Sequence, residues 1–482
     1  MLDFRPILYT IGILLTTLAA AMCAPLIADL VIGHPDWQVF AASAALTAFV
    51  GITLLLTTMA PPSRISVRQA FVLTTTSWLA MTFFASLPFA FADLELDFTD
   101  AFFEAMSGLT TTGSTIITSL DAAPNGILLW RAILQWLGGI GIIVMSIAIL
   151  PMLKIGGNQL FQMESSDSSE KALPRIAQIA SGVGFVYLAL TALCATLLWS
   201  SGFRGFDAIA HAMTTIATGG FSTRDGSIGA FANPTAEIII TCFMFLGALP
   251  FVLYLQAIRG RPFLLWRDQQ VRWFLLIVAF FILSVTAAHY ANNDINLGQA
   301  MREAAFNVTS IMTGTGYASA NYASWGSFAT GVFFFIMFVG GCAGSTTCSI
   351  KIFRYQILYQ TAKVQMKHLI RPHGIFLGTF NGRPITDEVE NSVMSFFFLF
   401  MLTFAILAGL LHFIGLDFLT AISGVATAIC NVGPALGDII GPTSNFSTLP
   451  DSAKWVLSAG MLLGRLELFT VLVLFAPWFW RG

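Results

Sequence analysis

Four stretches of the chain share one pattern, a short amphipathic run that ends in small or hydroxyl-bearing residues and a glycine. Counting back from each glycine, the residue twelve positions earlier is always alanine, and the residue six positions earlier always carries a hydroxyl. Agreement at several offsets without gaps indicates a fourfold internal repeat, which fixes the architecture before any other feature is interpreted. The four stretches are DAFFEAMSGLTTTGS (100–114), DAIAHAMTTIATGGF (207–221), EAAFNVTSIMTGTGY (303–317) and TAISGVATAICNVGP (420–434).

Acidic residues at the start of three stretches predict short helices. Asp100, Asp207 and Glu303 stand thirteen positions before their glycines, where a carboxylate favours the N-terminal end of a helix dipole. A helix of about a dozen residues covers about half of a hydrocarbon core about 30 Å thick, so it can enter a membrane but must then return. Non-helical backbone at that depth is tolerated only where protein buries it or where it lines a watery cavity. Four re-entrant loops around one axis would make such a cavity.

The residues before each glycine are suited to binding a cation through the backbone. They are small or β-branched, which favours an extended chain whose carbonyl groups can turn inward and replace a hydration shell. The glycine allows the conformations that a ladder of carbonyls needs. The predicted filter consists of Thr110, Thr111, Thr112, Gly113, Ala217, Thr218, Gly219, Gly220, Thr313, Gly314, Thr315, Gly316, Cys430, Asn431, Val432 and Gly433. A bound cation is expected at Thr111, Thr112, Thr218, Gly219, Gly314, Thr315, Asn431 and Val432.

The composition places this pattern in a membrane protein. The 482 residues are 56% hydrophobic and only 10% charged, and the mean hydropathy is +0.79, values that no soluble domain needs. Ten apolar stretches are long enough to span a bilayer, and the first is too long for a removable signal peptide. They cover residues 7–33, 38–60, 69–92, 127–153, 176–201, 234–258, 271–291, 326–350, 391–414 and 452–480.

The last eight spans fall into pairs that flank the four repeats. We therefore expect an all-α integral membrane protein in which two extra N-terminal helices precede four units of helix, pore loop and helix around a central pore. The expected boundaries are 1–66 for the two extra helices, 67–155 for the first unit, 156–174 for a cytoplasmic linker, 175–260 for the second unit, 261–370 for the third unit with a broken second helix, 371–389 for another cytoplasmic linker and 390–482 for the fourth unit.

The distribution of charge predicts the orientation. With both termini in the cytoplasm, most of the 23 lysines and arginines fall on the inner side, as the positive-inside rule requires. On the same map most of the acids lie at the outer side, among them Asp100, Glu104 and Asp121. A mouth lined by one sign of charge concentrates counter-ions, so the outer entrance is expected to attract cations. The bases expected on the outer side are Arg131, Arg204, Arg224, Arg302 and Lys454.

The eighth span is interrupted by a stretch of poor helix formers, CAGSTTCS, that follows two glycines. An irregular polar loop at membrane depth must be buried or line the pore, which suggests a gate below the third filter. The alternative is a helix kinked for packing. The candidate gating residues in this loop are Gly340, Gly341, Gly344, Ser345, Thr346 and Thr347.

Arg465 lies inside the last span, with Glu467 two positions later. Residues two apart on a helix do not face each other, so Glu467 cannot simply neutralise this arginine. An ionisable group inside a span is a functional candidate by default. We expect Arg465 to face the cavity below the filter, where its charge would resist cation passage; the alternatives are a partner on another helix or an interfacial position.

Other classes of function lack support in the sequence. The six cysteines show neither metal-ligand spacing nor a disulfide framework, and the six histidines are scattered. The chain has no nucleophile with a neighbouring base, no Gly-rich phosphate loop and no basic patch suited to nucleic acid. We therefore expect neither an enzyme nor a nucleic-acid-binding protein, and we expect no organic cofactor.

Four motifs in order resemble the bacterial TrkH and TrkG potassium uptake subunits, from the superfamily that includes KtrB and the plant HKT proteins. They are the fourfold pore loop with one glycine each, GGCAGSTTCSIK, NGRPITDEV and GRLELFTVL. The resemblance covers essentially the whole chain. It implies a homodimer in the bacterial inner membrane, with one K+-selective pore in each protomer, and a restriction formed by the loop at 340–347 and Arg465.

The resemblance also implies K+ and Rb+ as permeant ions, because glycine rather than serine stands at the first filter position, Gly113. Departures from fourfold symmetry are Ser114 and Pro434, where the second and third repeats have Phe221 and Tyr317. The family's gating partner is a cytoplasmic nucleotide-binding subunit of the TrkA type, which would hold any nucleotide. A coupled K+ symporter driven by H+ or Na+ is the alternative, although few ionisable groups beyond Arg465 and Glu467 lie at mid-span.

Overall fold

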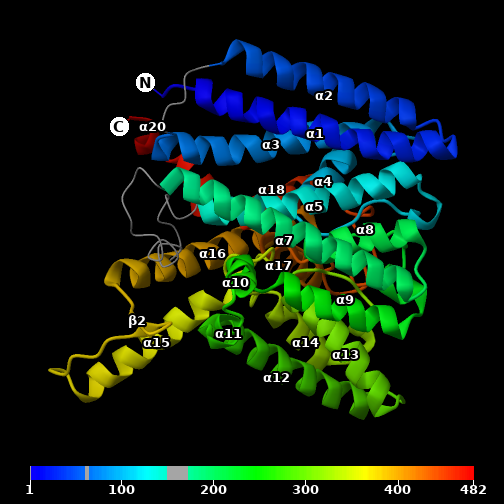
Figure 1. Ribbon diagram of the computed structural model, residues 1–482. Helices are drawn as coiled ribbons and strands as arrows, with labels where there is room; N and C mark the ends of the chain where they lie inside the picture. The colour runs from blue at the N-terminus through cyan, green and yellow to red at the C-terminus, as the bar shows by residue number, and fades with distance from the viewer. Residues whose placement is uncertain (1, 60–64, 149–171, 482) are drawn as a thin grey trace.

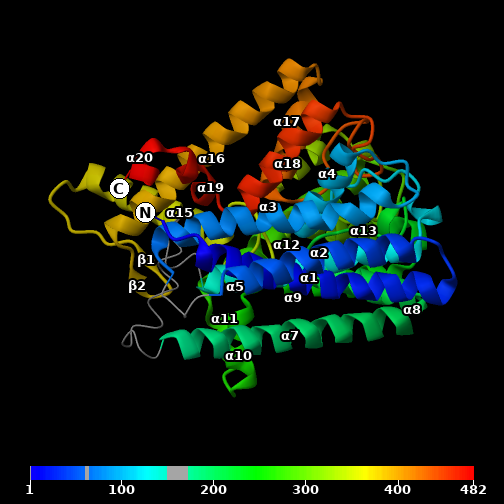
Figure 2. The same cartoon turned by 90° about the horizontal axis from the view of Figure 1, so that it is seen from above.

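The computed structural model describes residues 2–59, 65–148 and 172–481. Most of the predicted linker 156–174 lies outside these residues. The described chain is helical apart from loops and one short hairpin, in which β1 (Thr379–Phe380) pairs antiparallel with β2 (Arg383–Pro384). Both termini and this hairpin lie at one end of the molecule in both views (Figures 1 and 2). This all-helical membrane architecture confirms the predicted fold class.

Two N-terminal helices, α1 (Arg5–Ile32) and α2 (Trp37–Thr57), run side by side next to α3 (Figure 1). Their backbones approach closely, because a Cβ atom on Gly51 would lie 2.7 Å from the Thr16 hydroxyl and one on Gly12 would lie 2.9 Å from the Gly51 carbonyl oxygen. Small residues that allow close approach are the usual basis of helix association in membranes. The pair therefore forms a unit that packs on the first repeat.

The remaining helices follow the order of the four repeats. The first repeat contains α3 (Val67–Phe91), α4 (Phe98–Leu109) and α5 (Asn125–Ala148). The second contains α7 (Ala172–Ser200), α8 (Gly205–Ile216), α9 (Pro234–Gly247) and α10 (Phe251–Ile258). The third contains α11 (Phe263–Arg267), α12 (Gln269–Asn292), α13 (Leu297–Met312), α14 (Ser327–Ile336) and α15 (Ile352–Ile370). The fourth contains α16 (Asp387–Ile414), α17 (Phe418–Cys430), α18 (Asp451–Arg465), α19 (Phe469–Leu472) and α20 (Pro477–Arg481).

The short helices α4, α8, α13 and α17 begin at polar caps in three cases. The side chains of Asp97, Asn296 and Asp417 accept hydrogen bonds from backbone N–H groups in the first turns of α4, α13 and α17, which satisfies donors that a helix start leaves unpaired. The prediction that Glu303 stands at the start of the third short helix is wrong. Helix α13 begins at Leu297, so Glu303 lies in its second turn.

Seven described helices are long and apolar enough to cross a membrane. The predicted spans 234–258 and 452–480 each consist of two helices rather than one, because each is sharply bent. Helices α9 and α10 meet at 91°, and α18 and the segment that starts with α19 meet at 107°. The first bend contains Pro250, which has no N–H group to donate to a continuing helix. The second contains Glu467 and Leu468, with φ of 59° and 40°.

The predicted span 326–350 also fails to form one helix. Helix α14 ends at Ile336 and α15 begins at Ile352, and the intervening backbone contains left-handed glycines at Gly340 and Gly344. This interruption coincides with the stretch of glycines and hydroxyl side chains. It places a non-helical loop inside the helical assembly.

Candidate ion-binding site

Each of the four short helices ends in a Schellman turn. In this turn one residue in the left-handed conformation ends the helix, and the N–H group of the following residue donates a hydrogen bond to a carbonyl oxygen near the end of the helix. The left-handed residues are Thr111, Thr218, Gly314 and Asn431, with φ of 53°, 49°, 71° and 53°. The bonds run from the N–H groups of Thr112, Gly219, Thr315 and Val432 to the carbonyl oxygens of Ser107, Thr214, Ser310 and Thr427, at 2.9, 2.9, 2.8 and 3.0 Å. The hydroxyl-bearing position common to the four repeats thus supplies the carbonyl that closes each turn.

The four glycines and the residues before them form a closed ring. A Cβ atom on any of the four glycines would lie within 3.0 Å of a carbonyl oxygen in the next repeat, closer than real Cβ contacts. Gly433 of the fourth repeat lies against Thr112 of the first, so the order of contacts closes on itself. The ring pairs are Gly113 with Gly219, Gly220 with Thr315, Gly316 with Val432, and Gly433 with Thr112. We call these eight residues the carbonyl ring.

The residue after each ring glycine contacts the preceding repeat. Ser114 donates a hydrogen bond of 2.8 Å to the carbonyl oxygen of Gly433. The Phe221 ring lies 3.9 Å from the Arg131 guanidinium carbon, and the Tyr317 hydroxyl is hydrogen-bonded to Thr214. Pro434 lies against Gly316 of the third repeat. Ser114 and Pro434, which depart from the aromatic residues of the other two repeats, therefore occupy the same place in the structure but make different contacts.

A buried ion pair holds the loops that follow the ring segments of the first and second repeats. Arg131 on α5 and Glu104 on α4 are 1% and 0% exposed, and Arg131 Nε lies 2.7 Å from Glu104 Oε1. The other Glu104 oxygen accepts from the Ile116 N–H group at 2.8 Å. Arg131 also donates 2.7 Å hydrogen bonds to the Ser222 carbonyl oxygen and the Thr115 hydroxyl. Each buried charge thus has an opposite charge beside it and further hydrogen bonds around it, which offset the cost of its removal from water.

Several of the acids expected to give the outer mouth a negative field are paired. Lys454 lies 2.5 Å from Asp100, and Arg302 lies 3.1 Å from Glu237. A hydrogen bond from the Arg224 side chain holds the pKa of the Asp121 carboxyl below its usual value. The expectation of an acidic entrance is therefore weakened by bases on the same side.

The interrupting loop of the third repeat packs into the bend of the second. The Thr346 hydroxyl donates to the Gly247 carbonyl oxygen at 3.0 Å, and Phe251 N–H donates to the Gly344 carbonyl oxygen at 2.9 Å. The loop thus supplies partners for the open ends of α9 and α10. It also reaches the ring segments, since the Thr218 hydroxyl lies 3.1 Å from that of Thr346.

The loop is also bonded within itself. The Ser345 hydroxyl donates to the Cys342 carbonyl oxygen at 2.6 Å and lies 2.7 Å from the Thr347 hydroxyl. Gly341 packs so closely on Thr347 that a Cβ atom there would lie 2.7 Å from the threonine hydroxyl. All three hydroxyl side chains of the 345–347 segment are buried, so the loop has a defined packed position.

Arg465 joins the first, third and fourth repeats. It is 1% exposed at the end of α18. Its Nη2 donates to the Gly138 carbonyl oxygen on α5 at 2.8 Å, and its Nη1 lies 3.4 Å from the Thr346 carbonyl oxygen and 2.5 Å from the Cys348 sulfur. Within the described ranges no carboxylate lies in ion-pair distance of Arg465. In the described part of the chain its positive charge therefore meets backbone oxygens, a sulfur and the Trp78 ring, whose centroid lies 5.8 Å from the guanidinium carbon.

Glu467 pairs with two buried bases at the start of α15. Lys351 Nζ lies 3.1 Å from Glu467 Oε1, and Arg354 Nη2 is bonded to the other carboxylate oxygen. Lys351, Arg354 and Glu467 are 4%, 0% and 4% exposed. Glu467 ties the end of the loop to the bend after α18.

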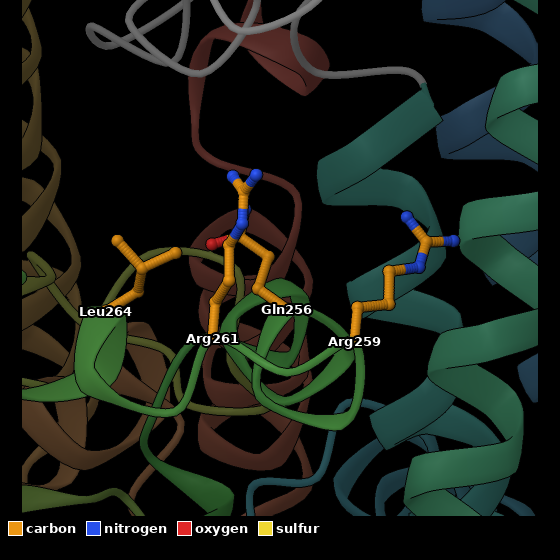
Figure 3. Close-up of a pocket in the computed structure, with 4 residues that line it drawn as sticks. All are labelled: Gln256, Arg259, Arg261 and Leu264. Atoms are coloured by element: carbon orange, nitrogen blue, oxygen red, sulfur yellow. The ribbon is translucent and has the colours of Figure 1, made fainter.

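A separate pocket lies on α10 and α11, away from the carbonyl ring. It has a volume of about 550 Å³ and is lined by Gln256, Arg259, Arg261 and Leu264 (Figure 3). None of these residues belongs to the ring or to the interrupting loop. The arginines make this pocket unsuited to a cation.

The TrkH family model, described as a cation transport protein, matches residues 36–481. This chain belongs to the TrkH family. It is 46% identical to the Trk system potassium uptake protein TrkI of Halomonas elongata, over 99% of this chain and 97% of that protein. It is 34% identical to the Trk system potassium uptake protein TrkH of Escherichia coli K12, over the whole of both chains.

The fold agrees with a solved member of the TrkH family. The crystal structure of the potassium transporter TrkH from Vibrio parahaemolyticus matches with a TM-score of 0.92 and 35% identity, over 100% of both chains. Membership of a family of cation transport proteins confirms the expected resemblance, and it confirms that the chain is a transporter and not an enzyme.

The structure brings most of the predicted site residues together. The ring and the Schellman turns contain or directly adjoin all sixteen predicted filter positions, and the loop at 340–347 lies beside Arg465. Sequence reasoning missed Gln135, Glu104 and Arg131 as neighbours of the ring. Arg131 had a detectable signal, because it is a charged residue within the apolar run GILLWRAILQW.

Proposed function

We propose that this TrkH-family chain is the membrane subunit of a potassium uptake system in the bacterial inner membrane. In this proposal K+ and Rb+ cross through a gated pore that is selective against Na+. The names of the full-length relatives support potassium as the ion, since both the Halomonas and the Escherichia proteins are potassium uptake proteins.

The closed carbonyl ring carries the proposal. Four equivalent backbone segments that meet around one axis offer the oxygen ligands that K+ requires in place of water, and such rings underlie K+ selectivity. The proposed ligands are the carbonyl groups at the eight positions named from the sequence, Thr111, Thr112, Thr218, Gly219, Gly314, Thr315, Asn431 and Val432. The Schellman turns support this role because they hold these segments at equivalent positions in each repeat.

The gate in this proposal consists of the loop at 340–347 and Arg465. A guanidinium without a carboxylate partner repels a cation that leaves the ring, and the polar loop occupies the same region. Opening then requires the loop and Arg465 to separate from each other. Their mutual hydrogen bond supports a shared movement.

The same proposal includes a homodimer, cytoplasmic termini and a TrkA-type regulatory subunit that binds the nucleotide. The common end at which both termini and the hairpin lie supports the placement of both termini on one side (Figure 2). The excess of lysine and arginine in the segments expected on that side supports a cytoplasmic position.

Ion flux into liposomes tests the proposal. The purified chain is reconstituted without a proton or sodium gradient, a membrane potential is imposed, and the uptake of Rb+, Na+ and Li+ is compared. Rb+ uptake well above that of Na+ and Li+, dependent on voltage alone, is expected. Uptake that requires a proton or sodium gradient would instead establish coupled symport.

A further inference from the structure

Gln135 is a buried polar side chain that joins the first repeat to the carbonyl ring of the second. It lies on α5 and is 0% exposed. Its Nε2 donates to the Gly219 carbonyl oxygen at 2.5 Å, and its Oε1 accepts from the Phe221 N–H group at 2.9 Å. Both hydrogen-bonding ends of one carboxamide are therefore used on the two sides of Gly220.

Gly219 is a glycine because Gln135 fills the space of its side chain. The equivalent residues of the other repeats are Thr112, Thr315 and Val432, all β-branched. The φ angle of Gly219 is not positive, so any residue could adopt its backbone conformation without strain. A Cβ atom there would, however, lie 2.5 Å from Gln135 Oε1 and 2.8 Å from Nε2. The carboxamide thus takes the volume that a side chain occupies in the other repeats.

Among the three repeats that share a glycine contact between the second helix and the end of the short helix, only the first has an amide at the position of Gln135. Gly138, Gly247 and Gly464 each face the carbonyl oxygen of the residue four positions before the glycine that ends their repeat's motif. This shared contact shows which positions correspond on the second helices of these three repeats. Three residues before these glycines stand Gln135, Met244 and Met461. Methionine offers no N–H donor. The ring accordingly receives a side-chain amide at Gly219 where the second and fourth repeats have a thioether on the corresponding helix.

We propose that Gln135 is a specificity-determining residue, which sets the position and the field strength of the Gly219 carbonyl within the ring. This inference rests on the proposed K+-selective pore. A carbonyl oxygen has two lone pairs, so Gly219 can accept from Gln135 and still face an ion. The donor draws electron density from that oxygen and, together with the bond to Phe221, holds the segment back from the axis. The size of the ligand cavity and the number and field strength of its carbonyl groups are the two properties that can set K+ over Na+ selectivity, and Gln135 acts on both.

The loss of this amide is expected to let the second repeat move toward the axis and ligate a smaller ion. Gln135→Met keeps the approximate length and volume of the side chain but removes both hydrogen bonds. The loss of a buried hydrogen bond of this kind corresponds to about a tenfold change in an equilibrium ratio. The Rb+ to Na+ uptake ratio should therefore fall about tenfold, chiefly through a rise in Na+ uptake.

Gln299→Met is the matched control. Gln299 lies on the short helix α13 of the third repeat and donates to Glu303 at 2.8 Å, away from the carbonyl ring. The same substitution there should leave the ratio at its wild-type value. Both variants and the wild type are measured in the same liposomes with Rb+ and Na+ under an imposed potential. Wild-type selectivity in Gln135→Met would overturn the inference alone, whereas an unselective wild type would overturn the proposed function and the inference with it.

A size exchange keeps the test decisive if Gln135→Met does not fold. Gly219→Ala alone should reduce Rb+ uptake, because the new methyl group collides with Gln135. The double variant Q135A/G219A removes that collision, so it should regain Rb+ uptake while its Rb+ to Na+ ratio stays about tenfold low. A double variant with the wild-type ratio would show that the space, and not the amide donor, matters, and it would overturn the inference.

Discussion

Arg465 Nη2 donates a hydrogen bond of 2.8 Å to the carbonyl oxygen of Gly138, which links the end of α18 in the fourth repeat to α5 in the first. The same glycine faces the Leu109 carbonyl oxygen at the end of helix α4. Gly138 alone therefore lies between the guanidinium and the segment that leads into the carbonyl ring. A change at Arg465 should affect ion passage more directly than a change at a peripheral arginine.

Arg465→Ala should raise basal Rb+ uptake at least tenfold, or about 1.4 kcal/mol of barrier. The reason is that a buried positive charge opposes a cation in a region of low dielectric constant. Arg465→Lys retains the charge and should keep uptake near the wild-type level. Equal uptake by the wild type and Arg465→Ala in liposomes would exclude the arginine as a barrier.

Deletion of residues 344–347 should also raise basal Rb+ uptake. The deletion removes the bonds of the loop to Gly247, to Phe251 and to Thr218, so the loop can no longer occupy its position beside Arg465. Uptake is compared with the wild type at the same amount of reconstituted protein. An unchanged rate would mean that the loop has a packing role only.

Gly113→Ala should abolish most of the Rb+ selectivity. An alanine at φ of 88° is strained by about 1–2 kcal/mol, and its Cβ atom would also collide with the Gly219 carbonyl oxygen. Gly202→Ala is the control, because Gly202 has φ of 105° but no atom within 4 Å of the Cβ position. The two variants share the backbone strain and differ in the collision. Equal loss of the Rb+ to Na+ ratio in both would contradict a role for the ring contact.

Glu467→Gln should destabilise the protein by about 3–5 kcal/mol, because Lys351 and Arg354 would both lose the buried carboxylate that they share. Asp121→Asn removes a partner of Arg224 at the surface, where an ion pair contributes about 0–1 kcal/mol. Unfolding in mixed detergent micelles measures both. A difference between the two variants of less than about 1 kcal/mol would contradict the importance of the buried cluster.

The sequence was sufficient to predict the repeats and the segments that form the ring. Offsets within a repeat are local, and the hydroxyl-bearing residues at Ser107, Thr214, Ser310 and Thr427 close the turns that the spacing implied. The stretch of glycines and hydroxyls after Ile336 predicted a break in the helix for the same reason, since it reflects local helix propensity.

Contacts between distant segments could not be predicted. The pairing of Glu467 with Lys351 and Arg354 joins residues more than one hundred positions apart, and so does the bond from Arg465 to Thr346. The bend after Arg465 depends on the same contacts, because left-handed Glu467 and Leu468 are held by the surrounding structure. Gln135 gave no signal because a single glutamine in an apolar helix does not reveal which backbone it will meet.

The location of bound ions tests the carbonyl ring most directly. A crystal of the protein grown with Rb+ and measured at the rubidium absorption edge would show anomalous density wherever the ion is held. We expect a peak on the axis between the carbonyl oxygens of Thr112, Gly219, Thr315 and Val432. Rubidium density at other places, with none on that axis, would contradict the ring as the ion-binding site.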